Sequence, residues 1–363
     1  MNIFIAILSI GILIILHELG HFFLAKKLGV KVEEFGIGMP PRILGRKWGE
    51  TLYSVNALPI GGFVRMEGEE KRSGGPGSFS QKPVWQRFLI VAGGVFVFWI
   101  IAAVIFGVLG ATAGIPMAIT DEQTRGVTNP QVQVIGVAPN SPAAAGGIRV
   151  GDTIKEIENK KSNIKKSETG KVGDIQEFTE GQKGQELIVT IQRGSEVLET
   201  TLTPREHPPA GEGPMGIALA RTTRIAYQWY EAPFQGVVLT GKLTWNILGG
   251  LGGLALNLIK GDGLPAGMQV TGPVGVVSLL GNSFQLGISQ FFFFIAVLSV
   301  YLAIFNTIPI PALDGGRMFF LLLEWIRRKP LPEEWERRMI AISFLILIPL
   351  ILWVTVNDIG RLF

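Results

Sequence analysis

The residues of this chain that could do chemistry lie inside an apolar run, GILIILHELGHFFLA at residues 11–25. On a helix, His17 and His21 are one turn apart and point the same way, so two neutral imidazoles could grip one zinc ion. Glu18 lies beside His17 and three residues before His21, where it could reach a water on that ion. The pattern is H-E-x-x-H, in which the carboxylate acts as a general base.

The alternative is that both histidines are core residues bonded to backbone carbonyls. The surrounding run is long enough to cross a bilayer, and ionisable groups at membrane depth are costly and by default mark function. The chain has only three histidines, and two of them form this pair. We therefore expect a metal site here, with Glu18 as its catalytic carboxylate.

A catalytic zinc ion needs a third protein ligand and an open position for water. His207 is one candidate, but it lies in the polar connection PREHPPAGEG. Asp314, in FNTIPIPALDGG, is the better one, because it follows an apolar segment expected to run parallel to the HELGH segment. Pro309 and Pro311 prevent a regular helix there, so freed carbonyls and Asn306 could line a polar cavity. Without the HELGH motif, a simple helix-end turn would be the preferred interpretation of Asp314.

The composition is that of a membrane protein. Of 363 residues, 47% are hydrophobic and 17% are charged, and the mean hydropathy is +0.37, which is too apolar for an ordinary soluble protein. Cysteine is absent, which excludes disulfides and thiolate metal sites. We interpret the net charge of +4 as a topology signal rather than a nucleic-acid-binding patch. No Lys or Arg precedes the first apolar run, so we expect it to be retained rather than removed as a signal peptide.

Basic residues gather in the connections 26–87 and 317–338, which the positive-inside rule assigns to the cytoplasm. Both termini and the connection 112–287 then lie outside. The stretch 234–259 is long but glycine-rich and broken by Lys242. If it crossed the membrane, the connections that follow it would lie on the sides opposite to those that the basic residues indicate. We therefore expect an interfacial or packed helix on the outer face. Four other segments approach the roughly 20 residues that a span needs: about 3–25, 88–111, 288–309 and 339–356.

Two regions between the spans have strand patterns. Residues 35–66 are apolar but divided by Gly and Pro, which predicts a small sheet dipping toward the membrane core. Residues 127–205 are polar, and VQVIGVA, ELIVTIQRG and VLETTLT in this region have the character of strands. We interpret KKSNIKKSETGK between them as a solvated loop rather than a lipid-binding patch.

Together these motifs resemble the site-2 protease family, and most of all bacterial RIP zinc metalloproteases of the regulator-of-sigma-E protease type. The resemblance covers nearly the whole chain. It rests on HELGH, on N-x-x-P-x-P-x-x-D-G from Asn306 to Gly315, and on NSPAAAGGIRVGD, which is similar to part of a PDZ domain. FGIG (35–38), ALPIGGFVRM (57–66) and TGPVGV (271–276) are also similar to segments of that family.

The resemblance implies a polytopic α-helical membrane protein with about four transmembrane helices, a membrane re-entrant β-sheet and an inserted PDZ-like (α+β) domain. It implies that Asp314 is the third zinc ligand and that Asn306 helps to hold the substrate backbone. We expect four parts. Residues 1–112 form a membrane catalytic part and residues 113–210 form a PDZ-like extracytoplasmic domain. Residues 211–287 form an extracytoplasmic linker with the interfacial helix, and residues 288–363 form a second membrane catalytic part.

The chain departs from the family pattern at two points. It has room for one PDZ domain, whereas relatives in some bacteria have two, and this bears on how substrates are gated. Arg317 follows Asp-Gly-Gly, where such relatives often have His, and this leaves the expected metal site intact.

The expected function is zinc-dependent intramembrane proteolysis in the bacterial inner membrane, in contact with lipid and with no nucleic-acid partner. The substrates would be single-span membrane proteins already trimmed by another protease, such as an anti-sigma factor or remnant signal peptides. The PDZ-like domain would gate access, either by excluding large outer domains or by capturing a new chain terminus.

Two alternatives belong to other classes of protein. A non-enzymatic membrane scaffold would bind no metal and would lose nothing on Glu18→Gln. A zinc transporter or metal sensor would need its ligands but not Glu18, and such a protein usually has more intramembrane polar residues than this sequence contains.

Overall fold

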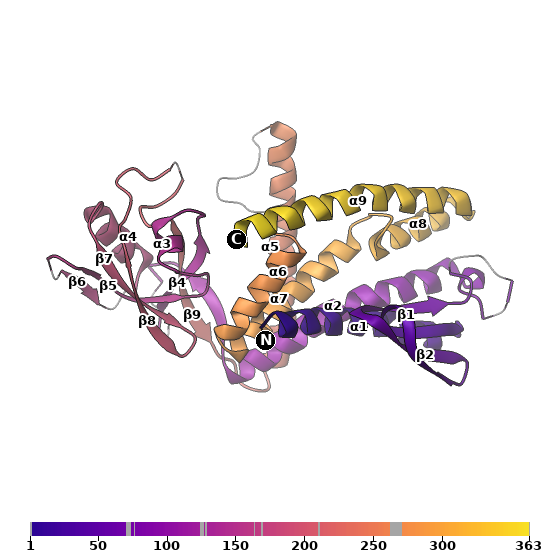
Figure 1. Cartoon of the computed structure of the whole chain (residues 1–363). Helices are drawn as coiled ribbons and strands as arrows, with labels where there is room; N and C mark the ends of the chain where they lie inside the picture. The colour runs from indigo at the N-terminus through magenta and orange to yellow at the C-terminus, as the bar shows by residue number, and fades with distance from the viewer. Residues whose placement is uncertain are drawn as a thin grey trace.

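The computed structural model describes residues 2–69, 74–75, 77–123, 127, 129–162, 164–167, 170–209, 211–261 and 271–362. Long helices form one part of the molecule, and a small β-sheet lies against them at one end (Figure 1). A separate β-rich domain, the insert, lies at the opposite end.

Within these described residues, four helices are long and apolar enough to cross a membrane. The number agrees with the sequence expectation, although the last helix begins six residues before the expected 339 and contains Pro349. The four are α1 (Asn2–Lys27), α2 (Val84–Thr112), α7 (Ile288–Thr307) and α9 (Glu333–Leu362).

The central helix of this part is α2, which packs against α1, α7, α5 (Ala232–Lys260) and α8 (Asp314–Arg327). Small residues allow the close approaches, as is usual between membrane helices. A Cβ added at Gly20 of α1 would lie 2.5 Å from the carbonyl oxygen of Gly93. One added at Gly236 of α5 would lie 2.2 Å from the carbonyl oxygen of Ala103.

The short helix α6 (Pro273–Gln285) closes the group by packing between α1, α7 and α9. A core of apolar side chains joins α1, α2, α6 and α7. Near the sheet, the buried Arg87 of α2 and Glu324 of α8 pair through two contacts of 3.1 and 2.5 Å. This ion pair holds α8 against α2, and it therefore also positions the first residue of α8.

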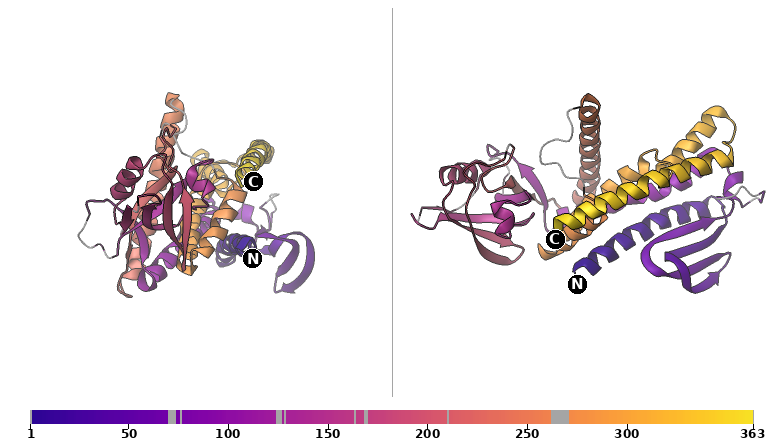
Figure 2. Two further views of the ribbon diagram at one scale, coloured as in Figure 1. Left: turned by 60° about the vertical axis from the view of Figure 1, so that its left-hand side comes forward. Right: turned by 45° about the horizontal axis from the view of Figure 1, so that its top comes forward.

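Helix α5 covers the stretch 234–259, and it stands steeply across the direction of the other long helices (Figures 1 and 2). Its first half packs on α2, where Trp99 donates a 3.1 Å hydrogen bond to Thr244. In its second half, Leu256 and Ile259 are exposed, at 57% and 81%.

The small sheet consists of two long, folded strands, β1 (Val32–Trp48) and β2 (Thr51–Met66). Each residue from Glu34 to Ile37 has two partners, one in 52–55 and one in 62–65. The end of β1 pairs back onto the start of β2, as Trp48 with Thr51 shows. The segment 62–66 is therefore an outer segment of the sheet, and it lies against α1.

The insert is an antiparallel sheet with the order β3-β9-β4-β5-β7-β8, and β6 pairs with β5. Helices α3 (Pro142–Ala145) and α4 (Val172–Gly181) pack against it. Its strands are β3 (Ile115–Ile119), β4 (Gln131–Val137), β5 (Thr153–Asn159), β6 (Lys165–Ser167), β7 (Leu187–Arg193), β8 (Glu196–Leu202) and β9 (Ile217–Ile225). A single 3₁₀ turn, Phe79–Gln81, precedes α2.

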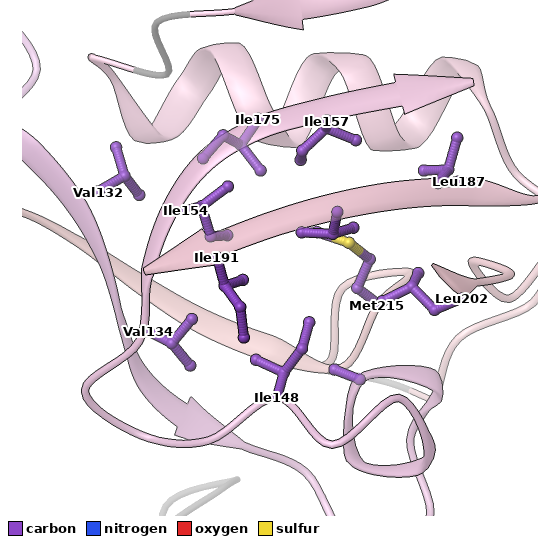
Figure 3. Close-up of a cluster of buried hydrophobic side chains, with 12 residues drawn as sticks. Val132, Val134, Ile148, Ile154, Ile157, Ile175, Leu187, Ile191, Leu202 and Met215 are labelled. Carbon is purple, nitrogen blue, oxygen red and sulfur yellow. The ribbon is translucent and has the colours of Figure 1, made fainter. Parts of the chain in front are cut away.

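Strand β9 pairs on both sides inside this sheet, although it lies in the segment 211–287 that the sequence division treats as a linker. Its sequence IALARTTRI has no clean alternation, which is why the strand could not be expected from the pattern. Within the loop KKSNIKKSETGK, residues 163, 168 and 169 lie outside the described residues. The insert has its own apolar core (Figure 3), formed by side chains that include Val134, Ile154, Ile157, Ile175, Leu187, Ile191 and Met215.

The insert touches the helices at the corner between α6 and α7. A Cβ at Gly151, where φ is +97°, would lie 2.1 Å from Leu286 Cδ1. One at Gly194 would lie 2.6 Å from the carbonyl oxygen of Gln285. The turn that carries Gly151 is held by the buried Asp152, whose carboxylate accepts two bonds from Arg193 and raises the pKa of that guanidinium.

The two marked chain ends lie on the side of the insert, and the β1–β2 sheet lies at the opposite end of the helices (Figures 1 and 2). The connection between α8 and α9 also lies at the sheet end. This arrangement has the same grouping of segments as the expected topology. Lys71, one of the basic residues on which that expectation depends, lies outside the described residues.

Candidate functional site

Both histidines of the HELGH motif are buried on one face of α1, each with 7% of its surface exposed. The ring of His17 stacks on Phe98 of α2, with centroids 4.7 Å apart and planes 17° from parallel. Nδ1 of His21 lies 2.9 Å from the carbonyl oxygen of Ile90, also on α2. Helix α2 therefore orients both rings.

Asp314 is the first residue of α8, and its carboxylate meets the two imidazoles. Asp314 Oδ2 lies 3.0 Å from His17 Nε2 and 3.4 Å from His21 Nε2. The two Nε2 atoms are 3.2 Å apart. A tetrahedral zinc ion with bonds of about 2.1 Å separates its ligands by roughly 3.4 Å, so the spacing of these three atoms fits one zinc ion.

The hydrogen bonding also fits a cation at this point. Ile90 offers a carbonyl, which only accepts, so Nδ1 of His21 must carry the proton and Nε2 of the neutral ring presents its lone pair. Oδ2 of Asp314 is buried and makes no hydrogen bond within the described residues. A buried carboxylate oxygen without a donor is costly, and a zinc ion among the three atoms would satisfy it.

Proline and glycine place Asp314. As the sequence predicts, α7 ends at Thr307 and the chain is non-helical until α8 begins. A Cβ at Gly315 would lie 2.1 Å from the carbonyl oxygen of Ile308, and one at Gly316 would lie 2.3 Å from that of Ile310. Only glycine fits at either position, so Asp-Gly-Gly allows α8 to start directly against the end of α7.

The three atoms open onto a cavity of about 620 Å³. Glu18, the motif's carboxylate, and Asn306 both line it. The amide of Asn306 donates a 2.9 Å bond to the carbonyl of Leu302 within its own helix. The outer sheet segment also contributes to the lining, from Phe63 to Met66.

His207, the other candidate ligand, is not part of this group. Within the described part of the chain, His17, His21 and Asp314 form the one set of three metal-binding side chains whose donor atoms lie within 4.8 Å of one another. His207 lies in the connection between β8 and β9 of the insert.

An ion pair on the cavity wall was not anticipated. Arg317 of α8 bonds Glu69, which follows the end of β2, and both residues line the cavity. The Glu69 carboxylate raises the pKa of the Arg317 guanidinium, and Asp314 adds to the increase. The sequence drew attention to Arg317 as a basic residue of the 317–338 connection and as a departure from a family pattern, and no spacing or motif marks Glu69.

A buried H-E-x-x-H motif that meets a second carboxylate between membrane-spanning helices is the arrangement of a membrane-embedded metalloprotease. The profile of peptidase family M50 matches residues 5–350. The chain belongs to this family, the site-2 proteases, and it is a zinc metalloprotease.

Individual relatives agree with this assignment. A protein of Clostridium perfringens described as a zinc metalloprotease is 34% identical over 99% of this chain and 98% of its own length. The regulator of sigma-W protease RasP of Bacillus subtilis is 30% identical over 98% of both chains. The zinc metalloprotease RasP of Bacillus licheniformis is 29% identical over the full length of both. These relatives favour the protease over the scaffold and transporter alternatives.

The contact between Gly94 and His21 leads to a prediction. A Cβ at Gly94 would lie 2.2 Å from His21 Nε2, so Gly94→Ala should push the imidazole out of its position. We expect zinc affinity to fall by about 10–100-fold, as when an orienting contact of a metal ligand is lost. Zinc content can be measured by elemental analysis after equilibration with a competing chelator.

The control is Gly249→Ala in α5, where the added methyl would meet nothing within 4 Å and helix propensity would improve. That variant should bind zinc as the wild type does. Wild-type zinc affinity in Gly94→Ala would contradict the assignment of His21 as a ligand held by α2.

Proposed function

We propose that this zinc metalloprotease cleaves transmembrane segments of single-span membrane proteins inside the membrane, with His17, His21 and Asp314 as zinc ligands and Glu18 as general base. One observation carries the proposal. Three donor atoms 3.0 to 3.4 Å apart lie in a cavity between apolar helices, and Glu18 shares that cavity.

The mechanism assigns one role to each polar residue. His17, His21 and Asp314 would hold the zinc ion, which when bound would supply Lewis-acid chemistry toward water and the scissile carbonyl. Glu18 takes a proton from the attacking water and delivers it to the leaving amide nitrogen. Asn306 turns its amide from Leu302 toward a freed backbone group of the substrate.

The substrate helix must be unwound before its peptide bonds can be hydrolysed, because all its backbone groups are already paired. The outer sheet segment 62–66 supports a route. Within the described residues, this segment pairs with a neighbouring strand segment on one side only, and it lines the cavity. Strand addition at this edge would hold the substrate extended.

Exposed apolar side chains support a re-entrant position for the sheet in the membrane. On the outer part of β1, Ile43, Leu44 and Trp48 are 63%, 67% and 81% exposed. Burial of these side chains in lipid would be favourable. The same argument applies to α5, whose crosswise direction and exposed Ile259 suit a helix lying in the membrane interface.

For the insert we propose a PDZ-like gate at the outer mouth of the membrane part. Its antiparallel sheet with one short and one longer helix supports the PDZ-like assignment. Its contact with Leu286, directly before α7, supports a position over the entrance. Pre-trimmed substrates are then favoured, and the name of the B. subtilis relative makes an anti-sigma factor the first substrate to test.

The chemical roles predict a clear separation of binding from catalysis. Glu18→Gln should keep about one zinc per chain and lower cleavage by about 10²–10⁴-fold, the contribution typical of a general base. His17→Ala, His21→Ala and Asp314→Ala should each lose zinc. The measurements are elemental analysis and cleavage of a panel of single-span substrates in liposomes.

His207→Ala is the matched control, because it removes the remaining histidine without touching the site, and it should keep both zinc and cleavage. Full cleavage activity of Glu18→Gln would contradict the proposed mechanism.

The proposed topology has both termini and the insert on the outer side of the inner membrane. The sheet enters the membrane from the cytoplasmic side, and the α8–α9 connection lies in the cytoplasm. The chain lacks cysteine, so single introduced cysteines report cleanly. Both Lys160 of the insert and Lys329 after α8 are exposed. Lys160→Cys should react with a membrane-impermeant thiol reagent in intact cells, and Lys329→Cys should react only after lysis. Labelling of position 329 in intact cells would break the four-span model.

The gate predicts altered selectivity when the insert is displaced. Gly151→Leu would clash with Leu286 and should raise the cleavage ratio of full-length to pre-trimmed substrate while zinc content stays unchanged. Deletion of 127–205 is a poorer test, because it would separate β3 and β9 from their sheet.

The control for this experiment is Gly181→Ala in α4, where a Cβ meets nothing within 4 Å; it should leave the ratio unchanged. An unchanged ratio in Gly151→Leu, with displacement of the insert demonstrated by altered proteolytic accessibility, would mean that the insert serves localisation or partner binding instead.

A further inference from the structure

Arg317 lies one helical turn after Asp314 on α8, so their side chains share a face with Cβ atoms about 5–6 Å apart. It lines the same cavity as the three proposed zinc ligands and Glu18. Its side chain is 47% exposed. Within the described residues, the single side chain that bonds it is Glu69, through Nη1. The guanidinium therefore has further donors that can reach the cavity.

Glu69, the residue that Arg317 bonds, is itself fixed in position. Its side chain is 11% exposed, and its Oε2 accepts a 3.4 Å bond from the backbone N–H of Met66 at the end of β2. A second cavity, of about 530 Å³, lies between α2, α8 and α9 and shares Glu69, Val91 and Arg317 with the first. The ion pair thus stands on the wall between the catalytic cavity and a neighbouring one.

Peptide hydrolysis creates a new negative charge at this place. The water oxygen bonds to the carbonyl carbon, the C–N bond breaks, and the nitrogen leaves as an amine with the proton it receives. The N-terminal fragment is left with an α-carboxylate. This anion forms beside Glu18, which is again a carboxylate once its proton has gone to the leaving nitrogen, and the two like charges repel.

The cavity has one other arginine, Arg65, which is less suited to receive this anion. It lies on the sheet, 3.3 Å from Glu34, with its guanidinium over the ring of Phe63. Arg317 lies instead beside Asp314, and a planar guanidinium can hold a carboxylate through two parallel bonds.

We propose that Arg317 is the binding site for the α-carboxylate of the N-terminal cleavage product, and that Glu69 occupies this site until the product forms. The inference rests on the proposed function, because it takes its ligand from peptide hydrolysis at the same cavity. Exchange of Glu69 for the product carboxylate draws the new chain end away from the zinc ligands and toward the second cavity.

The test compares two peptides that differ at one group. A fluorescent peptide with the sequence of the N-terminal product of a substrate segment is made with a free C-terminal carboxylate or with an amide. Binding of each to the zinc-loaded full chain in detergent is followed by fluorescence anisotropy. The wild type should prefer the carboxylate, and Arg317→Ala should reduce this preference by about 10–100-fold, the size of a lost charge-assisted contact.

Two further variants separate a binding role from a purely structural one. Arg317→Lys, which keeps the charge but not the planar fork, should retain an intermediate preference. Glu69→Gln removes the competing carboxylate and should strengthen carboxylate binding; if the pair only braces α8 against the sheet, the same change would weaken it or leave it unaltered. Arg327→Ala, at the exposed end of α8 and outside both cavities, is the matched control and should keep the wild-type preference.

An unchanged preference in Arg317→Ala, with zinc content and thermal midpoint preserved, would overturn the proposal. An equal loss in Arg327→Ala would also overturn it, because the effect would then be general attraction to positive charge. If Arg317→Ala does not fold, Arg317→Lys and Glu69→Gln decide, and weaker carboxylate binding in Glu69→Gln counts against it. Failure of the wild type to cleave any segment is a separate result that concerns the proposed function, since peptide binding is measured without turnover.

Discussion

The close packing of α2 on α1 is the constraint on which the site depends. Gly93 brings the two backbones together at Gly20, and at that separation Gly94 leaves room for the ring of His21 while the carbonyl of Ile90 fixes its tautomer. In a membrane, apolar burial does not drive helices together, so such contacts between small residues carry the association. The same contacts that hold the helices therefore also set the geometry of the two imidazoles.

Asp314, the proposed third ligand, is placed by a break between two helices rather than by a continuous helix. After α7 ends, the Pro-rich segment turns the chain, and Gly315 and Gly316 allow α8 to begin against its carbonyls. The buried pair between Arg87 and Glu324 then fixes α8 on α2. Removing one member of such a pair leaves an uncompensated buried charge, so this distant contact bears on where the Asp314 carboxylate lies.

Much of the site could be predicted because its chemistry is local in sequence. The spacing of His17 and His21, and the Pro and Gly residues around Asp314, each restrict the chain over a few residues. The parallel direction of two apolar segments was enough to bring these motifs together. Strand β9, the double pairing of 34–37 and the Glu69–Arg317 contact could not be predicted, since each depends on partners far away in the chain. Residues 234–259 are long enough to cross the bilayer, but α5 is not among the four described helices that are also apolar enough, and its direction in space differs from theirs.

The position of α7 explains how one rigid element connects the insert to the chemistry. At one end Leu286 precedes it and meets Gly151 of the insert. At the other end Asn306 lines the cavity, and the break that places Asp314 follows. Between these ends, Ile295 and Ala303 are buried in the core that α7 shares with α1 and α2, and closely packed interiors transmit displacement rather than absorb it. A shift of the insert at Leu286 would therefore act on the same helix that carries Asn306, which joins the proposed entrance to the proposed cleavage site.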